Sequence, residues 1–168
     1  MLTMETFIAI IVSITLAAIL GSVYLEIRRQ IKPRIKVYFP DGSTQASYKA
    51  KEEASVTIHI KNIGRYGFSK PCATELRIWV YTLPDFSLRE LRWSSGSSPY
   101  ARQAPSGGIF GGMQYVGDET SLSLFYKEEE TITVAMQMPE KTGRYTAKVA
   151  LQSAQGDLGI HELRIIVS

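Results

Sequence analysis

The sequence has few of the residues from which catalytic and metal sites are usually built. Its 168 residues include one cysteine, Cys72, and two histidines, His59 and His161. A single cysteine excludes an internal disulfide, a disulfide-dense scaffold and a zinc site built on cysteine ligands. Two histidines leave little material for a metal site of another kind. No cluster of residues indicates a reaction, so we predict a protein that is not an enzyme and has no cofactor or metal.

The remaining candidates for chemistry each have a simpler structural interpretation. His59 alternates with apolar residues, which predicts a solvated imidazole on the polar face of a strand. His161 and Glu162 fall on opposite strand faces and therefore do not form a dyad. Cys72 has no neighbouring base and is predicted to be a small buried side chain. The acidic run 128–130 precedes a strand and is predicted to be a solvated turn.

Charge is absent from a long stretch near the N-terminus. Nineteen consecutive residues, Phe7 to Leu25, are uncharged and mostly apolar. As a helix they would extend roughly 28 Å, close to the hydrocarbon thickness of a bilayer. A cleaved signal peptide would begin with basic residues and have a shorter apolar core, whereas residues 1–6 contain no Lys or Arg. We therefore predict a short tail and a retained transmembrane helix over residues 1–27.

Small side chains recur every fourth residue within this stretch. In a helix they would form one stripe, which consists of Ala9, Ser13, Ala17 and Gly21. Such stripes allow two helix backbones to approach closely in lipid, where packing drives association. The stripe predicts contact with other transmembrane subunits or self-association. The alternative is that small residues are simply common in membrane helices.

The net charge of +3 comes from one short segment. Five basic residues fall within residues 28–36, namely Arg28, Arg29, Lys32, Arg34 and Lys36. From Val37 onward, fourteen Lys and Arg balance fourteen Asp and Glu. A nucleic-acid module would have its basic patch on the folded domain, so we exclude nucleic acid as a partner. The segment is predicted to be a juxtamembrane region that binds the headgroups of membrane lipids.

The same charges predict how the chain is oriented in the cell membrane. All five lie after the hydrophobic run and none before it, which favours a single-pass protein with a cytoplasmic C-terminal domain. The lone cysteine is compatible with a reducing compartment. The only asparagine, Asn62, does not begin a glycosylation sequon. An extracytoplasmic domain stays the alternative, because long domains can be translocated regardless of charge.

After Pro33 the hydrophobic pattern changes to a period of two, and no later segment has a helical period. Short alternating runs are separated by Gly, Pro, Asn and Asp, which predicts an all-β fold. We predict an Ig-like antiparallel β-sandwich of about 7–8 strands over residues 37–168, with a barrel or a longer meander as alternatives. The runs are 35–39, 56–60, 76–82, 122–126, 132–138, 145–151 and 163–167.

One segment of this domain interrupts the pattern. Twelve of the nineteen residues from Ser94 to Gly112 are Ser, Gly or Pro. A structureless stretch of this length is usually functional or disordered, and we predict a flexible loop over residues 94–112. Its larger side chains, Tyr100, Arg102 and Phe110, are candidates for binding a partner. The simpler interpretation is a mobile insertion between two strands.

A second candidate for partner binding lies on the strand that begins near Leu76. If Leu76, Ile78 and Val80 face the core, then Arg77, Trp79 and Tyr81 face outward. A row of Arg, Trp and Tyr has the composition of an interface hot spot. The alternative is an aromatic row that another part of the same chain covers.

Two short motifs resemble those of known modules. A strand ends in Asn-x-Gly (Val56 to Gly64), and an acid-led strand (Glu128 to Met138) precedes Pro139 and the Gly143-Arg144-Tyr145 opening of another. In these features the chain resembles prokaryotic Ig-like adhesion modules of the CARDB and NEW3 type, and the resemblance implies a non-catalytic sandwich that binds or spaces other components. One N-terminal helix followed by a sandwich also looks like the layout of archaellum stator proteins, by analogy of architecture only.

These observations predict a non-catalytic, membrane-anchored β-sandwich protein. Its expected role is that of a structural, assembly or accessory subunit of a membrane protein complex. The alternative is a cell-surface adhesion or ligand-binding module anchored by the N-terminal helix. The side of the membrane on which the domain lies distinguishes the two.

Overall fold

The computed structural model describes residues 4–30, 32–64, 70–95, 108–110, 112–119 and 122–168. The chain divides into two compact units, Met1–Lys32 and Pro33–Ser168. The first unit is helical and the second is built of strands. Arg34 and Lys36, which the sequence analysis grouped with the basic segment, belong to the second unit, and Lys36 lies in its first strand.

The first unit consists of one helix, α1, which extends over the 27 residues Met4–Gln30. It confirms the predicted helix and continues three residues beyond the expected end, so that Arg28 and Arg29 are helical. Two hydroxyl groups within it donate to carbonyl oxygens one turn earlier, Thr15 to Ile11 and Ser22 to Ala18. Those hydroxyl groups therefore need no partner outside the helix.

The predicted transmembrane span is not supported. Within the described ranges, no helix is both long enough and apolar enough to cross a membrane.

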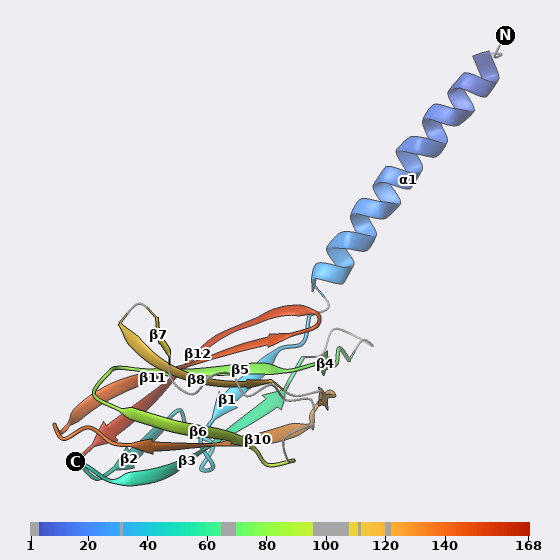
Figure 1. Ribbon diagram of the computed structural model, residues 1–168. Coiled ribbons are helices and arrows are strands. Elements are labelled where there is room, and N and C mark those ends of the chain that lie inside the picture. Colours follow the sequence, from blue (N-terminus) through green and yellow to red (C-terminus); the bar gives the residue numbers. More distant parts are fainter. Residues whose placement is uncertain (1–3, 31, 65–69, 96–107, 111, 120–121) are drawn as a thin grey trace. The chain divides into compact units, whose positions relative to one another are not determined.

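The second unit is a β-sandwich of two facing sheets (Figure 1). The four-stranded sheet has the order β1-β3-β10-β6, with β1 Ile35–Tyr38, β3 Glu53–Asn62, β10 Glu129–Gln137 and β6 Ser87–Trp93. The six-stranded sheet has the order β2-β12-β11-β5-β8-β7, with β2 Gln45–Tyr48, β12 Gly156–Val167, β11 Gly143–Ser153, β5 Arg77–Thr82, β8 Met113–Glu119 and β7 Gly108–Phe110. A short pair joins β4 Ala73–Thr74 to β9 Ser123–Leu124.

The core lies between the sheets and follows the alternation of the sequence. Apolar residues at every second position turn inward and are almost completely buried, such as Ile58 and Ile60 on β3, Ile132 and Val134 on β10, and Ile78 on β5. Burying each of these side chains contributes about 1.5–3 kcal/mol. The β-sandwich predicted from this alternation is therefore confirmed.

Two details of the predicted sandwich are wrong. The described residues form twelve strands rather than seven or eight, and β2 pairs with β12 in parallel, so the sandwich is not wholly antiparallel. The hydrophobic alternation did not predict β2, because it is a short edge strand with a partly exposed, polar sequence. It also did not predict β6, because a bulge opposite Ala135 and Met136 interrupts the alternation of that strand.

Part of the predicted loop over residues 94–112 is a strand. Gly108–Phe110 form strand β7, which pairs antiparallel with β8 through Phe110 and Met113. Ser94 is held beside β10, because its backbone N–H donates to Thr131 O at 2.8 Å. Residues 96–107 and 111 lie outside the described part of the chain.

The Asn-x-Gly motif fastens one corner of the sandwich. Asn62 is completely buried, and its Nδ2 donates to the carbonyl oxygens of Pro71 (2.8 Å) and Leu124 (2.9 Å). Its Oδ1 accepts from the N–H of Gly64 at 3.0 Å. A Cβ at Gly64 would lie 2.7 Å from the backbone nitrogen of Arg34, which requires glycine there. The motif is thus architectural, because it joins the end of β3 to β9 and to the segment before β4.

Candidate functional site

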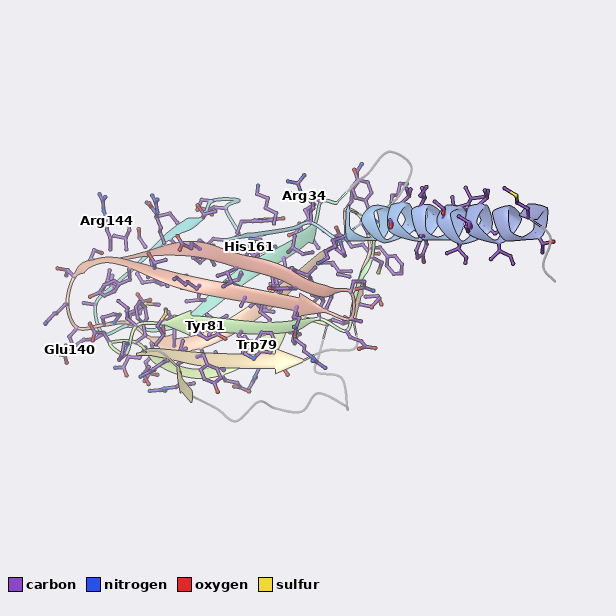
Figure 2. The ribbon with its side chains drawn as sticks, turned by 90° about the horizontal axis from the view of Figure 1, so that it is seen from above. Arg34, Trp79, Tyr81, Glu140, Arg144 and His161 are labelled. Atoms are coloured by element: carbon purple, nitrogen blue, oxygen red, sulfur yellow. The ribbon has the colours of Figure 1, made fainter. Side chains whose placement is uncertain are left out.

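Strand β5 presents its polar and aromatic residues on the outer face of the six-stranded sheet. Ile78 and Val80 are completely buried, whereas Trp79 and Tyr81 are half-buried and Arg77 is exposed. Figure 2 shows Trp79 and Tyr81 along this strand. The structure therefore places the three predicted residues on one outward-facing row.

Trp79 lies against the neighbouring strand β8. It is in register with Gly117, and a Cβ at that glycine would be 2.4 Å from Trp79 Cδ1. On its other side Trp79 is in register with Ala150 of β11. Small residues on both sides of Trp79 leave room for the indole beside the sheet, which gives this part of the face a broad apolar surface.

Two tyrosines extend this surface along the strands. Tyr81 and Tyr115 are in register, and their ring centroids are 5.7 Å apart with an interplanar angle of 38°. Burial, and then the proximity of Tyr115, raises the pKa of Tyr81. A protonated tyrosine hydroxyl group can both donate and accept a hydrogen bond.

We call this surface the aromatic face, defined by Trp79, Tyr81, Tyr115, Ala150 and Ile160. Ile160 is in register with Ala150 and is 66% exposed, the largest exposed fraction among the large apolar residues of the β unit that the structure describes. Arg77 and Lys148 flank the row, since Lys148 is in register with Tyr81. This surface combines aromatic rings, one exposed aliphatic side chain and flanking cations. Such a composition is typical of surfaces that bind a protein partner.

A second cluster lies on the outer face of the four-stranded sheet. Glu129 at the start of β10 accepts a hydrogen bond from the Tyr38 hydroxyl group at 2.7 Å and pairs with His59 Nδ1. The Lys61 ammonium group is 3.4 Å from the same carboxylate. The Tyr38 and His59 rings stack with centroids 5.6 Å apart, and Lys36 Nζ lies 5.0 Å from the Tyr38 centroid. One carboxylate thus joins side chains of β1, β3 and β10.

These contacts shift the pKa values within the cluster. The hydrogen bond from Tyr38, followed by that from His59, lowers the pKa of Glu129. Burial and the Glu129 carboxylate raise the pKa of Tyr38 to about 12. His59 lies half-buried on the polar face of its strand, as expected, but its imidazole also pairs with Glu129, because strand register brings the two together. Only the pairing of β3 with β10, which the sequence does not specify, reveals the contact.

The expectation that residues 128–130 form a solvated turn holds only in part, because Glu128 and Glu129 are exposed and Glu128 closes a turn, whereas Glu129 and Glu130 already belong to β10. Glu128 Oε2 accepts from the N–H of Phe125 at 2.9 Å, and Glu130 Oε1 accepts from Ser94 Oγ at 2.6 Å. A hollow of about 310 Å³ beside them is lined by Leu76, by residues 122–124 and by the three glutamates. Across the described ranges, no group of three or more His, Cys, Asp or Glu is placed to hold a metal ion.

The other candidates for chemistry are isolated. Cys72 is half-buried, and burial raises the pKa of its thiol, which opposes reactivity. His161 is half-buried on β12, and burial lowers the pKa of its imidazole. Its buried Nε2 has no hydrogen-bond partner among the described residues. Neither Cys72 nor His161 forms a pair with a second reactive side chain among the described residues.

The other residues predicted to bind lipid or a partner lie on α1, at the start of the β unit and in the segment 94–112. Ser13, Ala17 and Gly21 are exposed on α1, and a Cβ at Gly21 would meet no atom within 4 Å. Ala9, Arg28 and Arg29 are described only as part of the helical backbone, and Phe110 only as part of β7. Lys32, Arg34 and Lys36 are exposed. Tyr100 and Arg102 lie outside the described residues.

No protein-family model matches this sequence, and no curated protein is significantly similar to it. The resemblance to CARDB and NEW3 modules, and the analogy with archaellum stators, thus receive no support from a family.

Solved structures resemble the chain in fold. AvmM, which catalyses macrocyclization in Alchivemycin A biosynthesis, is 12% identical with a TM-score of 0.52, over 82% of this chain and 90% of AvmM. A putative membrane anchored protein from Corynebacterium diphtheriae is 13% identical with a TM-score of 0.48, over 82% of this chain and 35% of that one. The N-terminal domain of the Streptococcus gordonii adhesin Sgo0707 is 12% identical with a TM-score of 0.41, over 82% and 32%. The likeness to AvmM supports the fold alone, and the two with TM-scores below 0.5 support no inference.

Proposed function

We propose that this chain is a non-catalytic, membrane-anchored Ig-like β-sandwich that serves as an accessory or assembly subunit and binds a protein partner through the aromatic face. The main observation behind the proposal is the row formed by Trp79, Tyr81 and Tyr115 on the outer face of the six-stranded sheet. Aromatic rings on such a surface contribute nothing to the core between the sheets, which is filled by other residues.

The energetics of interfaces support a protein partner. Trp and Tyr dominate interface hot spots because they bury large areas while losing few rotamers. The Trp79 indole lies against Gly117 and the Tyr81 ring against Tyr115, and these contacts restrict the side-chain rotamers before a partner binds. A preorganised surface loses less entropy on association. Truncation of such an anchor commonly costs about 2 kcal/mol or more, which corresponds to about 30-fold in affinity.

The anchoring part of the proposal rests on helix α1. From Ile10 to Tyr24 its side chains are exposed, and none of them is charged. Its large apolar residues face every side of the helix, so that lipid or neighbouring membrane helices are needed to cover them. The stripe of Ser13, Ala17 and Gly21 supports contact with other membrane helices or a second copy. The basic residues 28–36 support contact with lipid headgroups and a cytoplasmic domain.

The alternative function is a cell-surface adhesion or ligand-binding module. It uses the same aromatic face but requires the domain on the outer side of the membrane. Protease treatment of intact cells and of inverted vesicles separates the two functions. We expect degradation of the β unit only in inverted vesicles, and degradation in intact cells would favour the adhesion module.

Site-specific crosslinking tests the proposed partner surface. A photoreactive phenylalanine analogue is placed at Tyr81 or, as the control, at Thr133 on the outer face of the four-stranded sheet. The full chain is then irradiated in its native membrane. The proposal predicts one discrete crosslinked protein species from position 81 and none from position 133. Equal crosslinking from both positions, or none from position 81, would contradict it.

A further inference from the structure

We infer that the end of the β unit at which Pro33 lies docks on an anionic lipid surface through a tip formed by Ile63, Lys70 and residues 125–127. The inference rests on the proposed anchoring by α1 and extends it. It assigns part of the membrane contact to segments that are distant in sequence from the basic residues 28–36.

Backbone hydrogen bonds bring the parts of this tip together. The N–H of Ile63 donates to Arg34 O, and the N–H of Lys127 donates to Asn62 O, both at 2.8 Å. The turn 125–128 is closed by Glu128 N–H donating to Phe125 O at 3.0 Å. The tip is thus attached to the start of the β unit, where the chain enters from Lys32 and Pro33.

Exposed apolar side chains concentrate at this tip. Four large apolar residues are exposed among the described residues of the β unit, namely Ile63 (46%), Leu83 (42%), Phe125 (55%) and Ile160 (66%). Ile160 belongs to the aromatic face. Ile63 and Phe125 both lie at the tip, because each directly follows a residue of the Asn62–Leu124 hydrogen bond. Phe and Ile side chains at the border of a bilayer enter the acyl boundary while the neighbouring backbone stays hydrated.

Cations surround these apolar residues. Lys70 Nζ and Lys127 Nζ lie 5.9 Å and 5.6 Å from the centroid of the Tyr126 ring. Arg34 is exposed beside Ile63. The carboxylate within the turn, Glu128, already accepts from the N–H of Phe125. Basic residues near an anionic membrane surface are attracted to its headgroups.

The acidic residues beside the tip already have partners, since Glu128 accepts from the N–H of Phe125, Glu129 pairs with His59 and Lys61, and Glu130 accepts from Ser94. Two further acidic residues at the same end belong to other turns. Glu75 follows β4, and Asp157 is the second residue of β12. Asp157 lies next to the hairpin in which Gln155 Oε1 accepts from the N–H of Thr74. They lie on the side of the six-stranded sheet. Lys70, Lys127 and Arg34 therefore lie beside the exposed apolar pair, next to glutamates that already have partners.

The opposite end of the sandwich has a different chemistry. Figure 2 shows Glu140 and Arg144 at the end away from Arg34. Glu140 pairs with Lys51 at 3.0 Å. Of the four exposed large apolar residues, only Leu83, in the turn between β5 and β6, lies at this end, whereas Ile63 and Phe125 both lie at the Arg34 end. A lipid surface is thus favoured at the Arg34 end over the Glu140 end.

The test uses the full chain bound to vesicles of two compositions, zwitterionic phosphatidylcholine alone or with anionic phosphatidylserine. Flotation reports anchoring, and hydrogen exchange of peptides covering 62–64 and 124–128 reports docking. We expect flotation in both compositions and at least three-fold slower exchange of these peptides only with phosphatidylserine. The double variant Lys70→Gln/Lys127→Gln should lose the slowing, whereas Lys49→Gln/Lys141→Gln should retain it.

The outcomes separate this inference from the proposed function. Flotation in both compositions with equal exchange would overturn the docking tip and leave the anchoring intact. Loss of flotation in both compositions would contradict the anchoring and, with it, this inference. Two further outcomes would overturn lipid docking. One is slower hydrogen exchange that persists in Lys70→Gln/Lys127→Gln. The other is slower exchange that appears on neutral vesicles only after a protein partner is added.

Discussion

The indole of Trp79 occupies the space that a side chain at Gly117 would need. A Cβ at Gly117 would lie 2.4 Å from Trp79 Cδ1 and 2.9 Å from the carbonyl oxygen of Ile78. The two residues are in register on neighbouring strands, so the glycine determines how the indole lies on the outer face. The geometry of the aromatic face therefore depends on the absence of a side chain as well as on the aromatic rings.

We predict that Gly117→Ala destabilises the β unit by about 1–3 kcal/mol, because the new Cβ collides with both the indole and the backbone. Chemical denaturation measures the loss. The double variant Trp79→Ala/Gly117→Ala should lose less than the sum of the single variants, since the indole collision is absent. Strict additivity would show that the two residues are not coupled.

Asn62 should be far more important than its single amide suggests. We expect Asn62→Ala to cost about 3 kcal/mol, because it leaves the buried carbonyl of Leu124, that of Pro71 and the N–H of Gly64 without a partner. Gln155→Ala is the matched control. Its amide also bonds the backbone, at Thr74, but at an exposed position where water replaces it. Equal losses in urea denaturation would contradict the corner role of Asn62.

The sequence predicted the elements of the core better than their arrangement. Alternation identified β3, β10 and β11 because both sides of the sandwich bury every second residue. Alternation could not identify β2, which is short and lies at an edge, or the bulged β6. It also predicted the outward row of Arg77, Trp79 and Tyr81. It missed Tyr115 and Gly117, since only the pairing of β5 with β8 places them beside that row.

The Tyr38–Glu129 hydrogen bond should be visible in an alkaline titration. The pKa of Tyr38 is raised to about 12 from an ordinary value of 10. A raised pKa stabilises the fold below pH 10, and this stability is lost as the pH rises from 10 to 12. A difference titration against Tyr38→Phe, followed by tyrosinate absorbance, isolates the residue. Glu129→Gln should lower the Tyr38 pKa, and an unchanged midpoint would refute the contact.

In the same cluster, the shift of the Glu129 pKa has the opposite direction to that of Tyr38, so its effect on stability appears at acid pH. The pKa of Glu129 is lowered from 4.5 by its hydrogen bonds from Tyr38 and His59. Its contribution to stability is therefore present above that ordinary value and is lost as the pH falls through the lowered pKa. We expect thermal unfolding of Glu129→Gln to depend less on pH below 4.5 than that of the wild type. Identical pH profiles would argue against the ion pair.

The fragment 33–168 should fold without α1. Its two sheets bury a common core among their own residues, and it needs no disulfide or metal. Circular dichroism should show a β spectrum with cooperative thermal unfolding. Substantial helix content, or unfolding without a transition, would show that the β unit depends on the helix.

The most direct test of the proposed partner surface compares two alanines at matched positions. Ala150 is half-buried on the outer face of the six-stranded sheet beside Trp79, and Ala135 is half-buried on the outer face of the four-stranded sheet. Each is replaced by lysine in the full chain, and the complex extracted from membranes in mild detergent is weighed by native mass spectrometry. The account predicts that Ala150→Lys dissociates the partner while Ala135→Lys retains it. A complex that survives Ala150→Lys, with the variant folded, would contradict it.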